Sequence, residues 1–93
     1  MVKAINIFSV EPFVVDEGDS TNLHKRFVIW REELEIYLVA AGVTDRNQKM
    51  AVLLHLGGKN IRDIYKPLKE GNDTFEIICT KLDDYFKPRK NLL

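Results

Sequence analysis

The chain has 93 residues, of which 45% are hydrophobic and 30% charged, so we expect one small globular domain. Residues 1–46 hold five basic and eight acidic side chains and residues 47–93 hold nine and six, a charge dipole that argues against nonspecific nucleic-acid binding as the main function. The single cysteine, Cys79, excludes an internal disulfide and a multi-cysteine zinc site. With no segment resembling a signal peptide or a membrane span, we expect a cytoplasmic protein without membrane contacts.

Residues 1–18 predict an extended N-terminal arm followed by a polar turn. The arm is rich in Val, Ile and Phe, but Pro12 removes a hydrogen-bond donor and the sequence offers no second strand for pairing. The arm should therefore lie on helices. We expect Phe13 and Val14 to be firmly packed, and residues 1–10 to dock conditionally on their own domain or on a neighbouring copy, or to be displaced by a peptide.

Residues 21–41 predict the central helix, because apolar side chains recur at steps of three and four. Asp19, Ser20 or Thr21 can cap its start, and Gly42 can end it in the left-handed conformation. The members of the apolar stripe are Leu23, Phe27, Trp30, Leu34, Tyr37, Leu38 and Ala41.

A second apolar set on the same helix lies off this stripe and leaves only a narrow polar strip. Two interpretations are open: the helix is buried between two layers, or part of the second set is a docking surface. The set consists of Val28, Ile29, Ile36 and Val39, and the polar strip of Arg31, Glu32, Glu33 and Glu35.

Three further helices are expected in residues 44–87. The first can be capped by Thr44, has Asp45 at the positive end of its dipole, and stops at Gly57 and Gly58. A short helix over 59–66 ends before Pro67, and Asp73 with Glu76 forms a capping-box pattern before the last helix, which ends at Pro88. Residues 19–87 thus predict an all-α bundle of four or five helices, and residues 88–93 a basic exit linker.

The stripe residues of the helices should meet in the core. We predict as core anchors Phe27, Trp30, Leu34, Leu54, Ile64, Leu82 and Phe86.

No catalytic or metal-binding constellation is evident. We expect His24 to lie on the surface and His55 at the edge of the core. Cys79 lies on an apolar helix face, where an inert thiol is expected. We therefore expect neither an enzyme nor a cofactor.

Four segments in order resemble one family: Pro12-Phe13, then Trp30 with Leu34 and Tyr37, then LLHLGGKNIRDIY at 53–65, and KLDDYFKPRKN at 81–91. Together they resemble the N-terminal lobe of the capsid region of Gag polyproteins from Ty3/gypsy retrotransposons. The resemblance implies a helical lobe that self-assembles into capsid shells. It also implies a following C-terminal lobe and often a zinc knuckle, and since neither is in this sequence, nucleic acid would be a partner only indirectly.

The chain is also similar to domesticated Gag proteins such as the neuronal protein Arc, whose N-lobe holds short linear peptides in an apolar groove. Two functions are therefore expected, ahead of a small enzyme or a DNA-binding domain. The first is a structural capsid domain that self-associates weakly, with Lys59 and Arg62 as assembly charges. The alternative is a peptide-binding adaptor, in which an arm made of Ile5, Ile7, Phe8, Val10 and Phe13 shares a groove near Phe27, Ile29 and Tyr37.

Overall fold

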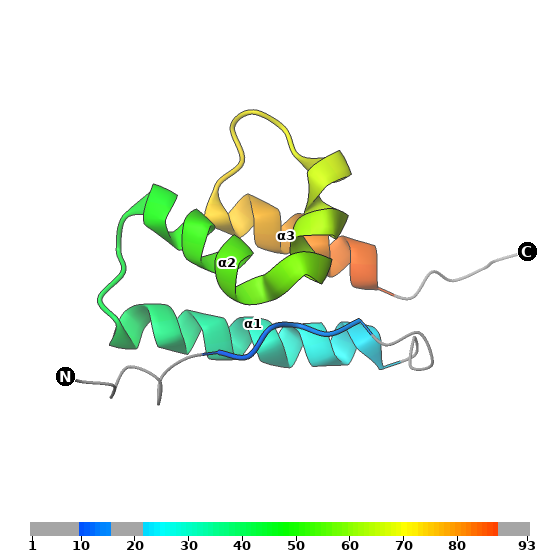
Figure 1. The fold of residues 1–93 in the computed structure, drawn as a ribbon, viewed down its shortest axis with the longest axis horizontal. Helices are drawn as coiled ribbons and strands as arrows, with labels where there is room; N and C mark the ends of the chain where they lie inside the picture. Colours follow the sequence, from blue (N-terminus) through cyan, green and yellow to red (C-terminus); the bar gives the residue numbers. More distant parts are fainter. Residues whose placement is uncertain (1–9, 16–21, 88–93) are drawn as a thin grey trace, which may run out of the picture.

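The computed structural model describes residues 10–15 and 22–87, and within these ranges every regular element is helical. The helices are α1 (Leu23–Ala40), α2 (Arg46–Tyr65) and α3 (Phe75–Phe86), with a short 3₁₀-helix, η2 (Lys66–Leu68), after α2. Figure 1 shows α1 with residues 10–15 running along it, and α2 and α3 on the other side of the core. The predicted all-α class is confirmed for this part of the chain. Residues 1–9, 16–21 and 88–93, including most of the predicted arm and the exit linker, lie outside the described residues.

The predicted number of helices is wrong, because the described part has three α-helices instead of four or five. The segments 44–57 and 59–66 belong to a single helix, α2, which is kinked at Gly58 (φ 84°, ψ −175°). A positive φ of this kind is readily adopted only by glycine. Helical geometry is therefore interrupted at Gly58, close to the predicted stop, but the segments on both sides form one kinked helix.

The C-terminus of α1 is closed as the sequence predicts. Gly42 has φ 73°, its N–H donates to the Val39 carbonyl (3.1 Å), and the Val43 N–H donates to the Leu38 carbonyl (2.9 Å). This pair of hydrogen bonds is a Schellman motif, which satisfies carbonyls left free at a helix end. The N-cap, Asn22, makes no side-chain capping bond, and the predicted caps at 19–21 lie outside the described residues.

The N-caps of α2 and α3 are each one residue after the predicted position. Asp45, not Thr44, accepts from the Gln48 N–H (2.9 Å), and Thr74, not Asp73, accepts from the Ile77 N–H (3.2 Å). All of these residue types cap helices well, so propensity alone does not separate neighbours.

α3 lies at the centre of the core, packing against both α1 and α2. Five predicted anchors are buried: Phe27, Trp30, Leu34, Leu82 and Phe86. The other two, Leu54 and Ile64, are only partly buried, because the rotation of α2 points their neighbours Leu53 and Tyr65 into the core instead.

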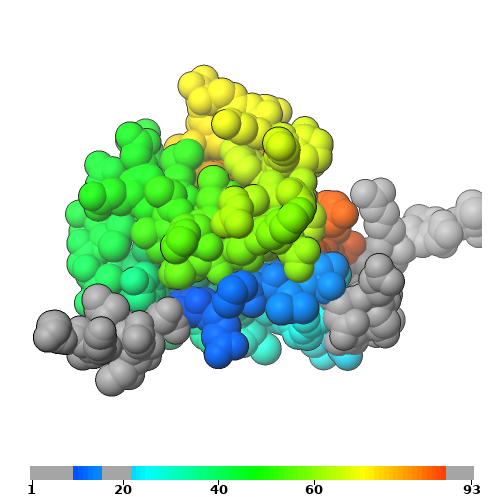
Figure 2. Space-filling model, in the orientation of Figure 1, coloured from blue at the N-terminus to red at the C-terminus, as the bar shows by residue number. Residues whose placement is uncertain are grey.

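Residues 10–15 complete the core between α1 and the kink of α2 (Figure 2). Val10 and Phe13 are buried, and the Phe13 ring lies 5.2–6.0 Å, between centroids, from the rings of Phe27, Trp30 and Phe86. The firm packing predicted for Phe13 is confirmed. Val14 was expected to be packed as well, but it is 58% exposed, because alternate residues of an extended segment point to opposite sides.

Candidate functional site

The outer face of α1 is the largest group of exposed apolar side chains in the described residues. Its four members are exposed to 38% (Val28), 55% (Ile29), 68% (Ile36) and 82% (Val39). They lie opposite the buried stripe of the same helix. The first interpretation of the second apolar set, a helix buried between two layers, is therefore wrong, because the described elements cover α1 on one side only. We call the four apolar residues, together with Glu32, Glu33 and Glu35, the outer face.

Two hollows adjoin the outer face. One is a shallow depression of about 500 Å³ on α1, lined by Glu32, Glu35, Ile36, Val39 and Ala40. The other is a pocket of about 310 Å³ between the end of α1 and the starts of α2 and α3, and it shares Glu35 and Val39 with the depression. An apolar surface that carries such hollows can accept side chains of another protein segment.

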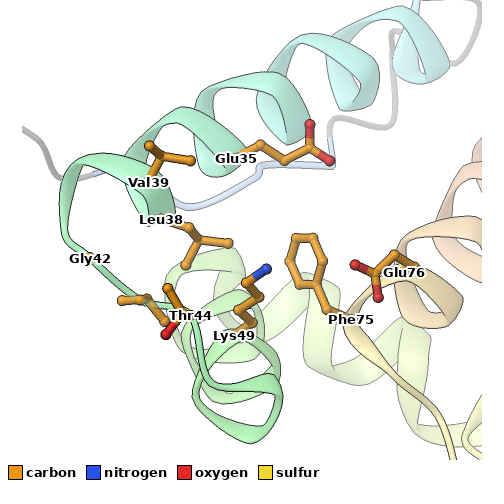
Figure 3. A pocket seen from close by; sticks show the side chains of 9 residues that line it. Glu35, Leu38, Val39, Gly42, Thr44, Lys49, Phe75 and Glu76 are labelled. Atoms are coloured by element: carbon orange, nitrogen blue, oxygen red, sulfur yellow. The ribbon is translucent and has the colours of Figure 1, made fainter.

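Figure 3 shows the pocket from close by, with an apolar interior and charged groups around it. Leu38 and Phe75 are buried in the core beneath it, and Lys49, Glu35 and Glu76 project from three different helices. Glu35 is paired with Arg31 on its own helix at 3.1 Å. The pocket can hold an apolar side chain with a polar end.

Residues 10–15 of the same chain lie beside two of the residues predicted to line the arm's groove, Phe27 and Ile29. Phe27 is fully buried there, Ile29 lies at its edge, and Tyr37 is partly buried against the core. The predicted arm residues Ile5, Ile7 and Phe8 lie outside the described residues.

Three hydrogen bonds hold the main chain of this segment. The Phe13 N–H donates to the Gly57 carbonyl (3.2 Å), the Trp30 Nε1–H donates to the Glu11 carbonyl (2.7 Å), and the Arg26 guanidinium donates to the Val14 carbonyl (2.6 Å). All three bonds use main-chain atoms of the segment, so they do not depend on which side chains the extended segment carries.

The predicted assembly charges, Lys59 and Arg62, lie close together on the part of α2 that follows the kink at Gly58. Lys59 is 81% exposed at its side chain and pairs with Asp63 at 2.7 Å, an exposed contact of small energetic value. Arg62 donates to the Leu54 carbonyl (2.9 Å) across the kink, so it also supports the helix. Lys66 is exposed one turn further on.

A buried polar cluster of Tyr65, Asp73 and Lys81 is not predicted by the sequence, because its members are spaced eight residues apart and match no local pattern. Asp73 accepts hydrogen bonds from the Tyr65 hydroxyl (2.6 Å), the Glu70 N–H (3.2 Å) and Lys81 Nζ (3.1 Å). The bond from Tyr65, with those from Lys81 and Glu70, holds the pKa of the Asp73 carboxyl below its usual value. Burial, then the bond to Asp73, raises the pKa of Tyr65 to about 12.

The surroundings of the two histidines and of Cys79 indicate no catalytic role. The His24 ring bonds Asp83 at 2.7 Å and so joins α1 to α3, while His55 is exposed. Cys79 is completely buried, and burial raises the pKa of its thiol to about 12, which leaves it protonated and unreactive at neutral pH. Among residues 10–15 and 22–87, no group of three His, Cys, Asp or Glu side chains could hold a metal ion.

Comparisons with protein-family models, with curated proteins and with solved structures found no match for this chain. The resemblance to Gag capsid lobes therefore depends on the four sequence segments alone. Within the described residues, no helix is both long enough and apolar enough to cross a bilayer.

Proposed function

We propose that this chain is a structural domain that associates with copies of itself, as the N-lobe of a capsid does. The observation that carries the proposal is the outer face of α1, on which Ile36 and Val39 are 68% and 82% exposed. Large apolar side chains gathered on one face at this exposure are typical of protein contact sites. The four sequence segments that resemble Gag capsid lobes support the proposal that the self-association is of the capsid type.

Such a contact should be weak for one pair of domains. A single helix face buries much less surface than a stable dimer needs, so we expect a dissociation constant of roughly 0.1–1 mM. A shell tolerates weak contacts, because each domain makes several of them at once.

Sedimentation equilibrium over rising protein concentration tests this proposal. The double variant Ile36→Gln with Val39→Gln should remain monomeric where the parent associates, because its outer face no longer gains from leaving water. Ile77→Gln is the matched control, since Ile77 is 42% exposed but lies on α3. A parent that stays monomeric at about 1 mM, or an outer-face variant that associates like the parent, contradicts the proposal.

A second candidate function, peptide binding, is favoured by the groove around residues 10–15. Trp30 and Arg26 donate to main-chain carbonyls of this segment, and the Gly57 carbonyl accepts from it. Another extended peptide with an aromatic side chain at the position of Phe13 could make the same bonds.

Phe13→Ala provides the test of this candidate, because it should weaken the hold on the chain's own segment. A synthetic peptide VEPFVV, which copies residues 10–15, is titrated into this variant and into the parent. Trp30, the only tryptophan, lies in the groove and reports by fluorescence. VEPFVV should bind the variant more tightly than the parent, and VEPAVV is the control peptide. Equal binding of VEPFVV to both proteins, or no binding to either, would contradict the peptide-binding function.

A further inference from the structure

We infer that the outer face of α1 docks onto the basic surface of α2 in a second copy of this chain, so that copies join head to tail. This inference rests on the proposed self-association and names the two surfaces that meet. The basic surface consists of Lys59, Arg62 and Lys66, which recur at i, i+3 and i+7 on one side of the chain after the kink.

The outer face carries acidic groups that the described part of the chain does not neutralise. Glu32 and Glu33 are exposed and have no ion-pair partner among the described residues, and only Glu35 is paired, with Arg31. These carboxylates interrupt the apolar side chains of Ile29, Ile36 and Val39. An occupant must therefore be apolar and cationic at the same time.

This charge pattern disfavours pairing of the outer face with itself. Against a second copy of itself, the outer face would bring Glu32 and Glu33 near the same carboxylates of the other copy, and it has no basic residue to pair with them. Pairing of two identical outer faces would thus bring like charges into one contact, which weakens binding. A different surface of the second copy fits better.

The basic surface of α2 has the complementary chemistry. Lys66 makes no salt bridge within the described ranges, its charge and that of Arg62 act on Asp63 only at longer range, and the pair of Lys59 with Asp63 is exposed and easily exchanged. The methylene stems of Lys and Arg cover apolar surface while their charged ends reach carboxylates. They can therefore cover Ile36 and Val39 and pair with Glu32 and Glu33 in one contact.

The two surfaces lie on different helices on either side of the core (Figure 1), so one molecule can use both with two neighbours. Contacts between unlike surfaces propagate, giving a ring when the rotation closes and a filament when it does not. The contact should also weaken as salt is added, because its charges are exposed.

Two charge-reversed variants test the inference by sedimentation equilibrium of the whole chain. The acidic variant, Lys59→Glu with Lys66→Glu, changes the basic surface but keeps Arg62, which supports the kink. The basic variant, Glu32→Lys with Glu33→Lys, changes the outer face. Arg46→Glu with Lys87→Glu, two exposed sites elsewhere, is the control with the same net charge as the acidic variant.

Each variant alone should associate at least about tenfold more weakly than the parent, because it presents like charges to itself. An equimolar mixture of the two should associate again, since the outer face of each then meets an opposite charge on the other. The control should match the parent. Circular dichroism checks folding, and Lys59→Glu and Glu32→Lys as single changes replace any double variant that unfolds.

Parent-like association of the acidic variant would overturn the inference but leave the proposed function intact, since the outer face would then have another partner surface on the second copy. A mixture that stays monomeric would also overturn it. A parent that never associates would contradict the proposed function as well.

Discussion

The two sides of α1 are almost equally apolar, yet the fold treats them in opposite ways. On the inner side, Phe27 and Leu34 are fully buried, and on the outer side Ile36 and Val39 are more than two-thirds exposed. The residue types do not explain this difference, because isoleucine and valine are buried as readily as leucine. The neighbours do: α3 and residues 10–15 cover one side, and no described element covers the other.

The comparison shows that the hydrophobic pattern of a helix predicts which side chains gain from burial. It does not predict which surface will bury them. The inner side obtains its partner within the chain, so its burial stabilises the fold. The outer side would obtain one only from another molecule, so its apolar residues should contribute little to the stability of the single domain. The following changes test this contrast, beginning with the largest effect expected on stability.

Trp30→Ala should destabilise the domain by about 3–5 kcal/mol, because it removes a buried ring and leaves a cavity. Trp30 is 6% exposed, packs beside Phe13 and Phe27, and also loses its hydrogen bond to Glu11. Urea unfolding followed by circular dichroism measures the loss. A variant that unfolds at nearly the parent's urea concentration would contradict the assignment of the inner side as the core.

Gly58→Ala should cost about 1–3 kcal/mol, since alanine is strained at φ 84° and its Cβ would lie 3.0 Å from Pro12 Cβ. The change acts on the kink against which residues 10–15 pack. Gly71→Ala is the control, because no atom lies within 4 Å of its added Cβ. Equal thermal midpoints for the two variants would mean that the kink tolerates a side chain.

Tyr65→Phe should change how stability depends on pH. The bond from Tyr65 is the main reason that the pKa of Asp73 is below 3.8 in the folded state, so stability present above that pH is lost as the pH falls through the folded value. On acidification the Tyr65→Phe variant should lose less stability than the parent. The difference between the thermal midpoints of the two proteins should therefore narrow.

The alkaline side gives the second half of this test. Because the pKa of Tyr65 is raised from 10.0 to about 12, its contribution is present below pH 10 and is lost as the pH rises through 12, in the parent only. Cys79 has a raised pKa in both proteins and cancels in the comparison. If the thermal midpoints of the parent and of Tyr65→Phe changed in parallel with pH, the role of the Tyr65–Asp73 bond in pH-dependent stability would be contradicted.

Much of the fold follows from local patterns. The helical class and the left-handed end at Gly42 were predictable, because periodicity and glycine conformation are local properties. The packing of Phe13 was also expected, because an apolar side chain just before the central helix has that helix within reach. The kink at Gly58 was not, since a helix can bend or end at two glycines and the choice depends on tertiary contacts such as the bond from Phe13 to Gly57. The rotation of α2, which buries Leu53 in preference to Leu54, is likewise set by packing.

The candidate site was predictable only as a choice between two interpretations. The second apolar set of α1 was visible in the sequence, but whether a second layer covers it depends on how many elements the chain has and where they pack. The cluster of Tyr65, Asp73 and Lys81 gave no sequence pattern, because it forms only when η2 and the loop after it fold back on α3.

Ile36→Gln with Val39→Gln should have the smallest effect on stability, within about 0.5 kcal/mol of the parent, because both side chains are mostly in water in the folded domain. Thermal unfolding in dilute solution measures it, with Leu34→Ala as the contrasting change on the inner side of the same helix. A loss comparable to that of Leu34→Ala would show that the outer face is part of the fold after all.

The most direct test of the central claim is a methyl ¹³C spectrum of the parent chain recorded from about 0.05 to 1 mM, across the expected range of dissociation. The methyl signals of Ile29, Ile36 and Val39 should move with concentration, while those of the buried Leu34, Leu38 and Ile78 stay in place. Outer-face methyl signals that do not move over this range, or that move no more than the buried ones, would contradict the claim that the outer face of α1 binds a second copy.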